Sequence, residues 1–231
     1  MNCRYAIYFA PSEASLLWRT ASQWLGRDAA RNVALAQPEV PGYSAERVAA
    51  LTQTPRLYGF HATLKAPFHL DEVQSAVALC GALAQFAQER VAFALPELEV
   101  ATLSGFLALL PKQRSAALHA LADDCMAAFE PFRRPPEAGE LARRRVAGLT
   151  ARQDTLLARF GYPYVLDEFR FHMTLTGPLE PSDGARLRQW LGQHFAAALN
   201  EPIQVGDLCL FVQDRPDAEF FILQRFPLKP R

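Results

Sequence analysis

The chain has 231 residues, of which 50% are hydrophobic and 21% are charged, with 17 prolines and 12 glycines. This composition is typical of a globular protein, and it excludes a disordered, collagen-like or coiled-coil chain. Lysine plus arginine number 24 and aspartate plus glutamate number 24, so the formal net charge is zero. Proteins that coat long nucleic acids usually carry a basic excess, so no long nucleic acid partner is expected. A pocket for one small phosphate remains compatible with this balance.

Cysteine usage and hydropathy indicate a cytoplasmic protein. The four cysteines are scattered and form no metal-binding motif, so we expect reduced thiols: Cys3, Cys80, Cys125 and Cys209. The apolar run at the N-terminus contains a charge and is too short for a signal peptide. No stretch approaches the roughly 20 apolar residues of a membrane span, so we expect no membrane contact. The sequence assigns no oligomeric state.

Strands and helices are predicted in alternation through the first half of the chain. A strand over 3–10 stops at Pro11, and Ser12 is then expected to cap a helix that runs to about Gly26. The remaining strands of this half are expected at 60–64, 91–103 and 105–110. Helices are expected at 44–52 and 71–89, the second from its apolar spacing.

The second half shows a similar order after a segment of different character. Residues 130–148 are basic and proline-rich, which predicts a long exposed connection. Helices are expected on both sides of it, at 115–129, 149–160 and 183–199. Strands are expected at 169–176, 203–212 and 218–226.

An internal repeat relates the two halves, which we place at about 1–112 and 113–231 of a single domain over 1–231. The segment FHATLKAPF at 60–68 aligns with FHMTLTGPL at 171–179, and five of the nine positions are identical. The offset of 111 residues also carries the predicted helix at 71–89 onto that at 183–199. We expect a duplicated unit with a pseudo-two-fold axis.

Strand alternation defines a polar face in each copy of this repeat. His61 and Thr63 share one face of their strand, while the apolar neighbours pack on the other. The same alternation places His172 and Thr174 on one face of the second strand. A pseudo-two-fold axis would set these polar faces against each other, so that two imidazoles and two hydroxyls converge on a cleft.

The two His-x-Thr-Leu motifs in a chain of this length resemble those of the 2H phosphoesterase superfamily, which includes cyclic nucleotide phosphodiesterases and LigT-like RNA 2′,5′ ligases/phosphodiesterases. The text GYPY at 161–164, followed by FRFHMTLTG at 169–177, is similar to an uncharacterised bacterial branch encoded beside phosphonate-utilisation genes. The resemblance covers nearly the whole chain. It implies a bilobal α+β fold, with two antiparallel sheets around a central groove and helices on the outside.

The chemistry of phosphodiester opening suits these residue types. One histidine takes a proton from water and the other protonates the leaving alkoxide, roles that a pKa of about 6.5 permits near neutral pH. We expect His61 and His172 to fill these roles, in an order that the sequence leaves open. Hydroxyls of Thr63 and Thr174 would hold the non-bridging oxygens. The sequence contains no His-x-His or His-Glu-x-x-His motif, so neither a metal site nor another cofactor is expected.

Four further residues are candidates for substrate binding, and three of them have an alternative interpretation. Arg170 lies two residues before His172 and would grip phosphate, or else lie in solvent. Lys65 follows Thr63 by two residues, and Thr176 follows Thr174 by two, so alternation brings both to the polar faces; a charge at the rim is the alternative for Lys65. Tyr8 would stack on a base or sugar if its strand neighbours 60–64, or else pack in the core.

Other polar residues have plainer interpretations. The arginines of the basic connection would form either an anion-steering lid over the groove or a solvated surface: Arg133, Arg134, Arg143, Arg144 and Arg145. The remaining histidines, His69, His119 and His194, are expected to be structural or exposed.

These patterns together predict a metal-independent phosphodiesterase, a hydrolase of the 2H type, acting on a small cyclic or 2′,5′-linked phosphate ester. The resemblance places it in phosphonate metabolism, with a ribose-phosphate or nucleotide-like substrate as its partner. Two alternatives stay open at this point. One is a non-catalytic module that binds a nucleotide or phosphonate intermediate, and the other is an RNA 2′,5′ ligase/phosphodiesterase.

Overall fold

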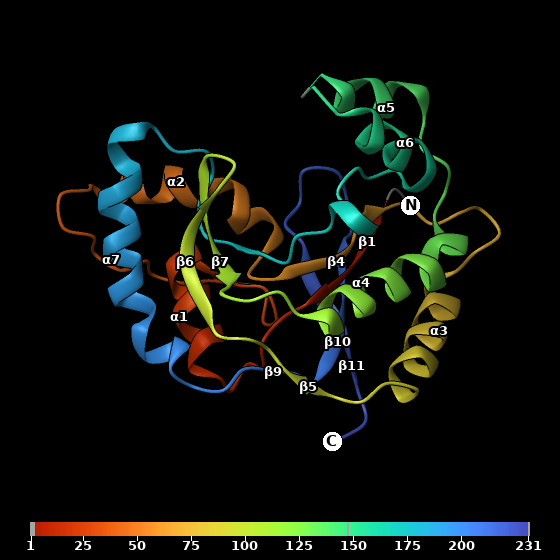
Figure 1. Cartoon of the computed structure of the whole chain (residues 1–231), viewed down its shortest axis with the longest axis horizontal. Coiled ribbons are helices and arrows are strands. Elements are labelled where there is room, and N and C mark those ends of the chain that lie inside the picture. Colours follow the sequence, from red (N-terminus) through yellow and green to blue (C-terminus); the bar gives the residue numbers. More distant parts are fainter. Residues whose placement is uncertain (1–2, 147, 231) are drawn as a thin grey trace.

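A seven-stranded antiparallel sheet forms the centre of the computed structural model, which describes residues 3–146 and 148–230 (Figure 1). The strand order is β11-β10-β1-β4-β8-β7-β6. Its strands are β1 (Arg4–Phe9), β4 (Ala62–Phe68), β6 (Leu98–Leu103), β7 (Phe106–Pro111), β8 (Met173–Thr174), β10 (Asp207–Gln213) and β11 (Phe221–Pro227). The α+β class is therefore confirmed.

Two short ladders lie outside this sheet. β2 (Arg27–Asp28) pairs with β3 (Val33–Ala34), a hairpin that the sequence analysis did not predict. β5 (Phe93–Ala94) pairs with β9 (Gln204–Val205) and so joins segments from the two halves of the chain. The strand expected over 91–103 is thus divided into β5 and β6.

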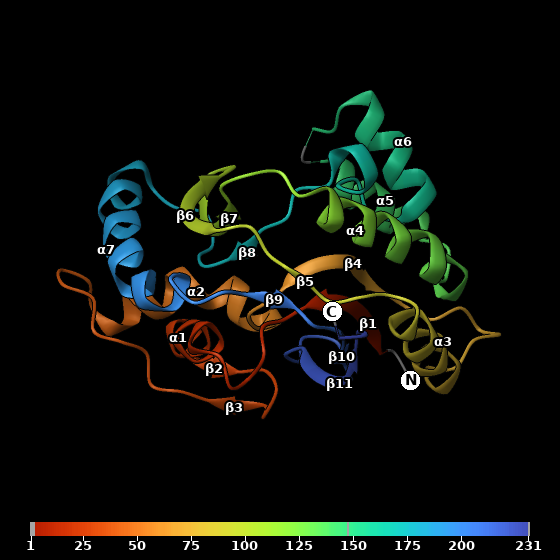
Figure 2. The ribbon, with the colours of Figure 1, turned by 60° about the horizontal axis from the view of Figure 1, so that its bottom comes forward.

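Two groups of helices cover the sheet, and a third group, α5 and α6, stands apart from it (Figures 1 and 2). α1, α2 and α7 gather beside β6 and β7, while α3 and α4 lie against β10, β11 and β4. The helices are α1 (Leu16–Leu25), α2 (Ala45–Tyr58), α3 (Ala76–Gln88), α4 (Ala116–Phe129), α5 (Ala138–Arg145), α6 (Ala151–Phe160) and α7 (Pro181–Leu199). Two single 3₁₀ turns follow Phe129 and Val165: η1 (Glu130–Phe132) and η2 (Leu166–Glu168).

Serine and threonine side chains determine where five of the helices begin. Each hydroxyl accepts a hydrogen bond from a backbone N–H in the first turn, which satisfies a donor that has no partner within the helix. The capping residues are Ser15, Ser44, Ser75, Ser115 and Thr150. The predicted cap at Ser12 is therefore wrong by one turn: Ser12 forms a turn in which its carbonyl accepts from Ser15.

The prediction of two separate sheets is also corrected. The two sides of the sheet, β11-β10-β1-β4 and β8-β7-β6, join into one sheet through the pairing of Ala62 with Met173. β8 spans two residues where a strand over 169–176 was expected, because the chain before it lies in turns and extended loop. β4 therefore has an unpaired edge beyond this junction, and the open space at that edge positions the site.

The basic segment 130–148 is more ordered than a simple exposed connection. It contains η1 and α5, and α5 packs against α6 above the rest of the molecule (Figure 1). A small separate apolar cluster anchors this part: Met126 of α4 packs with Leu156 and Phe160 of α6 and with Val165. The segment is largely exposed, as predicted, but it belongs to a folded helical projection over the free edge of β4.

The remaining features of the fold are its hydrophobic core, its cysteines and the hydropathy of its helices. The main core is continuous and includes Trp18, Trp24, Phe195 and Phe211, all fully buried. All four cysteines are free, as expected, and Cys125 and Cys209 are buried. Within the described part of the chain, every helix is too short or too polar to cross a lipid bilayer.

Candidate active site

The two His-x-Thr motifs lie side by side on neighbouring strands. Ala62 of β4 pairs with Met173 of β8 in antiparallel register. Continuing this register by one residue in each direction sets His61 against Thr174 and Thr63 against His172, all on the face opposite the buried Ala62 and Met173. The motifs therefore converge within a single sheet, whereas the sequence analysis expected them to face each other across a cleft between two sheets.

His61 is held in one orientation by its backbone and aromatic neighbours. Its Nδ1 lies 2.9 Å from the carbonyl oxygen of Gly59. A carbonyl only accepts, so Nδ1 carries the proton and Nε2 keeps the lone pair. Tyr8 stacks on the ring with the centroids 3.7 Å apart. Burial lowers the pKa of His61 to about 4, against a smaller raising effect of the Gly59 carbonyl.

Gly59 itself has a geometric role in this arrangement. Its φ of 75° lies in the left-handed region, and a Cβ at this position would come within 2.5 Å of the Ala29 Cβ. Only glycine fits there without strain. The residue ends α2 and turns the chain so that its carbonyl faces the His61 ring.

His172 repeats the same local hydrogen bond. Its Nδ1 donates to the carbonyl of Arg170 at 2.7 Å, again two residues upstream, so Nε2 is once more the free nitrogen. Burial lowers the pKa of His172, and the Arg170 carbonyl raises it to a smaller extent. The positive charge of protonated His172 further lowers the pKa of His61. The two imidazoles therefore lie within electrostatic reach of each other.

The threonine hydroxyls belong to the same cluster. Thr63 Oγ1 lies 3.3 Å from His61 Nε2, so the threonine hydroxyl donates a hydrogen bond to the unprotonated nitrogen of that ring. Thr63 also lines the neighbouring cleft. Thr174 is half-buried, and its strand position pairs with Ala108 of β7.

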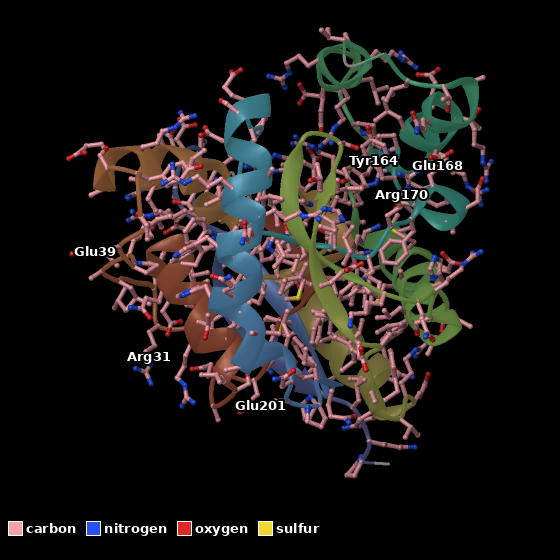
Figure 3. All side chains as sticks on the ribbon, turned by 60° about the vertical axis from the view of Figure 1, so that its left-hand side comes forward. Arg31, Glu39, Tyr164, Glu168, Arg170 and Glu201 are labelled. Carbon is pink, nitrogen blue, oxygen red and sulfur yellow. The ribbon has the colours of Figure 1, made fainter. Side chains whose placement is uncertain are left out.

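A cleft of about 430 Å³ adjoins this cluster at the free edge of β4. Its polar wall includes Thr63, His172 and the exposed side chain of Arg170. Apolar and aromatic side chains form much of the rest, among them Leu103, Phe106, Val165 and Phe169. Figure 3 shows Tyr164, Glu168 and Arg170 close together beneath the helical projection. All three line this cleft.

Lys65 does not share the face of Thr63, so it does not line the cleft to which Thr63 and His172 contribute. Thr63 lies opposite Tyr8, but the register shifts by one residue, so that Lys65 lies opposite Ile7 on the other face of the sheet. The lysine side chain is 2% exposed, and its Nζ binds Glu130 at 2.7 Å. Burial lowers the pKa of Lys65, and the Glu130 carboxylate partly offsets this effect.

Thr176 is displaced by a similar irregularity in the second strand. The backbone N–H groups of Leu175 and Thr176 both donate to the carbonyl of Leu107. Thr176 is fully buried, and its Oγ1 accepts a hydrogen bond from the Leu107 amide at 3.0 Å. Its hydroxyl therefore supports strand pairing and does not reach the cleft, contrary to the prediction.

Tyr8 lies beside the site, but it does not line the cleft as proposed. It is 1% exposed, so no base or sugar can stack on it, and its ring covers His61 instead. The prediction for Tyr8 required its strand to neighbour the strand at 60–64, and this arrangement is confirmed, because β1 pairs with β4. The pKa of Tyr8 is raised well above its usual value, mainly by burial, so the hydroxyl stays protonated at neutral pH.

Four aromatic residues of the cleft were not predicted from the sequence: Phe106, Tyr162, Tyr164 and Phe169. Tyr164 is 45% exposed and packs edge-on against Tyr162 with the centroids 5.6 Å apart. The sequence GYPY at 161–164 could have indicated the two tyrosines, because it contributes to the family resemblance although no role was assigned to it. Its position in the site depends on how 130–170 folds over β4.

The other histidines have local partners. His119 Nδ1 donates to the Ser115 carbonyl, and His69 Nδ1 donates to the Cys3 carbonyl. His194 stacks on Trp190 with the centroids 4.6 Å apart. Among the described residues, no group of three or more His, Cys, Asp or Glu side chains has a geometry that fits a metal ion.

Comparison with known proteins gives the family of this chain. Residues 63–221 match the family described as "Protein of unknown function (DUF1045)", so the chain belongs to that family. Two curated relatives, from Janthinobacterium sp. (strain Marseille) and Laribacter hongkongensis (strain HLHK9), are both named Ribose 1,5-bisphosphate phosphokinase PhnN. Each is 40% identical over 228 and 223 residues, respectively, covering 97% and 94% of this chain. The chain spans about half the length of these curated relatives, 50% in each case.

Solved structures also align with the whole chain. E. coli LigT in apo form matches with a TM-score of 0.49 and 13% sequence identity, covering 99% of both chains. E. coli LigT complexed with 3′-AMP matches with a TM-score of 0.44 and 14% identity, again covering 99% of both chains.

Proposed function

We propose that the chain is a phosphodiesterase that hydrolyses a small cyclic or 2′,5′-linked phosphate ester by acid–base catalysis between His61 and His172. The observation that carries this proposal is the shared hydrogen-bond pattern of the two rings. Each donates Nδ1–H to the carbonyl two residues upstream, so Nε2 carries the lone pair for proton transfer in both rings, and in His61 this nitrogen accepts from the Thr63 hydroxyl. Two such imidazoles on adjacent strands, beside a cleft, supply the base and the acid that ester hydrolysis needs.

The proton balance of the reaction follows from these roles. The neutral imidazole removes a proton from water as the water oxygen bonds to phosphorus. The protonated imidazole gives its proton to the ester oxygen whose bond to phosphorus breaks. A cyclic ester gives one product that carries both a new hydroxyl and a phosphate monoester, whereas a 2′,5′-linked ester gives a separate alcohol and phosphate monoester. After the step, the histidine that acted as base is protonated and the histidine that acted as acid is neutral. Release of one proton and uptake of another then restores the starting state.

The difference in environment assigns the two roles. His61 has a pKa of about 4 and is covered by Tyr8, so it is neutral at physiological pH. His172 lines the cleft, and a proton on its ring lowers the pKa of His61 further, so we assign the catalytic proton to His172. His61 is then the base and His172 the acid. A bound phosphate anion raises both pKa values, because it stabilises the protonated ring.

Hydroxyl groups and one arginine complete the site. Thr63 and Thr174 offer neutral donors for the non-bridging oxygens, where negative charge increases in the transition state. Arg170 presents an exposed guanidinium at the same cleft, which suits a bidentate contact with phosphate. Tyr164 presents an exposed ring at the mouth of the cleft, where a base or sugar would stack.

The relatives favour a phosphorylated ribose as the substrate class. They carry a kinase name that refers to ribose 1,5-bisphosphate, and this chain matches half of their length. An enzyme that opens a cyclic phosphate of ribose produces a ribose phosphate, the class of compound that such a kinase consumes. A role in phosphonate metabolism agrees with a phosphorylated ribose as substrate and with the family that the sequence resembles. We therefore include the substrate class and this metabolic role in the proposal.

Turnover in the presence of EDTA tests the proposal. The panel consists of 2′,3′-cyclic nucleotides, ribose cyclic phosphates and 2′,5′-linked dinucleotides. We expect hydrolysis of at least one cyclic ester, with His61→Ala and His172→Ala each lowering kcat by a factor of at least about 100, the lower range for acid–base groups. Absence of turnover across the panel, or activity that both variants retain, would overturn the proposal.

A further inference from the structure

A second cavity, of about 380 Å³, lies next to the proposed catalytic cleft, and cationic side chains dominate its wall. They come from β1, from β4 and from the basic segment 130–148. The cations are Arg4, Lys65, Arg133, Arg134, Arg143 and Arg144. The proposed catalytic mechanism uses none of them.

The positive charge of this cavity exceeds its negative charge. Three carboxylates pair with its cations: Glu130 binds Lys65 and Arg133, Glu137 binds Arg134, and Glu140 binds Arg144. Six cations against three carboxylates leave an excess of three positive charges. The whole chain has a formal net charge of zero, so this excess is a local feature of one cavity. A cavity of this kind attracts an anion.

Two of the arginines have guanidinium groups available for a ligand. For Arg4, the described contacts are a hydrogen bond from Nε to Gln213 Oε1 at 2.6 Å and the Phe220 ring beneath the guanidinium. Arg143 lies on α5 with its side chain exposed, and within the described ranges it has no ion pair. Guanidinium groups bind phosphate oxygens bidentately, which suits them to a phosphate monoester.

The basic cavity and the catalytic cleft share part of their walls. Ala66 of β4 and Tyr162 line both. The guanidinium of Arg144 lies 5.7 Å from the centroid of the Tyr162 ring, on the side of the basic cavity. Burial raises the pKa of Tyr162 to about 12, so its hydroxyl is a neutral hydrogen-bond donor. One small molecule that passes Tyr162 can therefore place an anionic group in each cavity.

We propose that the basic cavity binds a second phosphate group of the substrate, a phosphate monoester on the same small molecule whose phosphodiester lies between His61 and His172. This inference rests on the proposed function for the identity of the catalytic cleft. It specifies the substrate class as a bisphosphorylated metabolite with one cyclic or diester phosphate and one terminal monoester. Arg4, Arg143 and Arg144 are the residues that recognise the terminal group.

A matched pair of substrates tests this inference through kinetics. Adenosine 2′,3′-cyclic phosphate and its 5′-phosphorylated form differ only by the terminal monoester. We expect the 5′-phosphate to raise kcat/KM at least tenfold, mainly through KM, and Arg143→Met with Arg144→Met to abolish that ratio. Arg145→Met is the control, because Arg145 lies on the same helix but pairs with Asp154 outside the cavity. The control should leave both the ratio and the activity unchanged.

A binding measurement separates this inference from the proposed function. Titration calorimetry compares adenosine 2′,5′-bisphosphate with adenosine 2′-monophosphate, and we expect at least tenfold tighter binding of the bisphosphate. The preference should persist in His61→Ala and disappear in the double arginine variant. Preference without turnover would overturn the phosphodiesterase and keep the second phosphate site. Turnover without preference, equal loss in the Arg145→Met control, or preference for a 2′,5′-linked dinucleotide over the bisphosphate would overturn the site.

Discussion

Ala62 of β4 pairs with Met173 of β8, and these two residues are separated by the same 111 positions that align the two His-x-Thr motifs. Each residue is thus paired with its own counterpart in the repeat. An axis that passes between them carries His61 towards the position of His172 and Thr63 towards that of Thr174. The proximity of the two histidines follows from this one pair, because strand alternation then places all four polar side chains on one face.

The assignment of base and acid predicts a bell-shaped dependence of kcat/KM on pH. Activity requires neutral His61, with a pKa of about 4, and protonated His172, whose pKa burial holds below the usual value of about 6.5. The maximum should therefore lie on the acid side of neutrality for the free enzyme. For kcat it should move to higher pH, since bound phosphate raises both pKa values.

Variants of each histidine identify the two limbs of this profile. His61→Ala should remove the acid limb, and His172→Ala should remove the alkaline limb, each at a much reduced rate. The measurement is the initial rate over a pH series with the substrate found in the panel. If His61→Ala removed the alkaline limb and His172→Ala the acid limb, the assignment of base and acid would be reversed. If both limbs persisted in both variants, neither histidine would be the base or the acid.

His61 also predicts a pH dependence of stability. An unfolded histidine has a pKa of about 6.5, whereas the folded value is about 4. Between these values the unfolded chain binds more protons, so the free energy of unfolding rises with pH across the window and is constant above it. The difference between the folded and unfolded pKa of His61 corresponds to a total change of about 3 kcal/mol in the free energy of unfolding.

Urea unfolding of the wild type and of His61→Gln, measured between about pH 4 and pH 7, isolates this contribution. Groups other than His61 and His172 titrate equally in both proteins, so the difference between the two curves reports on position 61 and its coupling to His172. The wild type should lose more stability than the variant as the pH falls. Parallel curves would show that the His61 ring is not desolvated in solution.

The two threonines Thr63 and Thr176 should respond oppositely to replacement by valine. Thr63→Val removes the hydroxyl beside His61 Nε2, so we expect a lower kcat with an unchanged melting temperature. Thr176→Val leaves the buried Leu107 amide without its acceptor, which costs about 1–3 kcal/mol of stability. Activity assays and thermal unfolding of both variants provide the comparison. A collapse of the melting temperature in Thr63→Val would indicate a packing role for Thr63.

Glu130 is predicted to stabilise the fold through the buried Lys65. Glu130→Gln removes the carboxylate that binds both Lys65 and Arg133, and it leaves the buried ammonium uncompensated. We expect a loss of about 3 kcal/mol in the free energy of unfolding. Glu137→Gln is the matched control, since Glu137 forms an exposed pair with Arg134 and should change stability by less than about 0.5 kcal/mol. Equal effects of the two variants would contradict a buried role for Lys65.

Local sequence patterns predicted much of the secondary structure. β1 was expected at 3–10 and lies at Arg4–Phe9, and the helix expected from 115 begins after its Ser115 cap. The helix expected at 149–160 ends at Phe160, as predicted, with Gly161 as its C-cap. These features depend on side chains within one or two turns of each other, so the sequence carries them directly. The hairpin of β2 and β3 was missed, because two-residue strands leave no periodicity to detect.

The sequence by itself determined which residues recur as His-x-Thr and therefore which chemistry the two halves share. Only the tertiary structure decided which other side chains lie beside the two His-x-Thr motifs in the site. Alternation alone placed Lys65 and Thr176 beside the site, but the irregular register after each motif turns both side chains into the interior. Register shifts and burial depend on the partner strand, which is distant in the sequence. For the same reason, the cleft wall contributed by 153–170 and the lowered pKa of His61 follow from the folded packing alone.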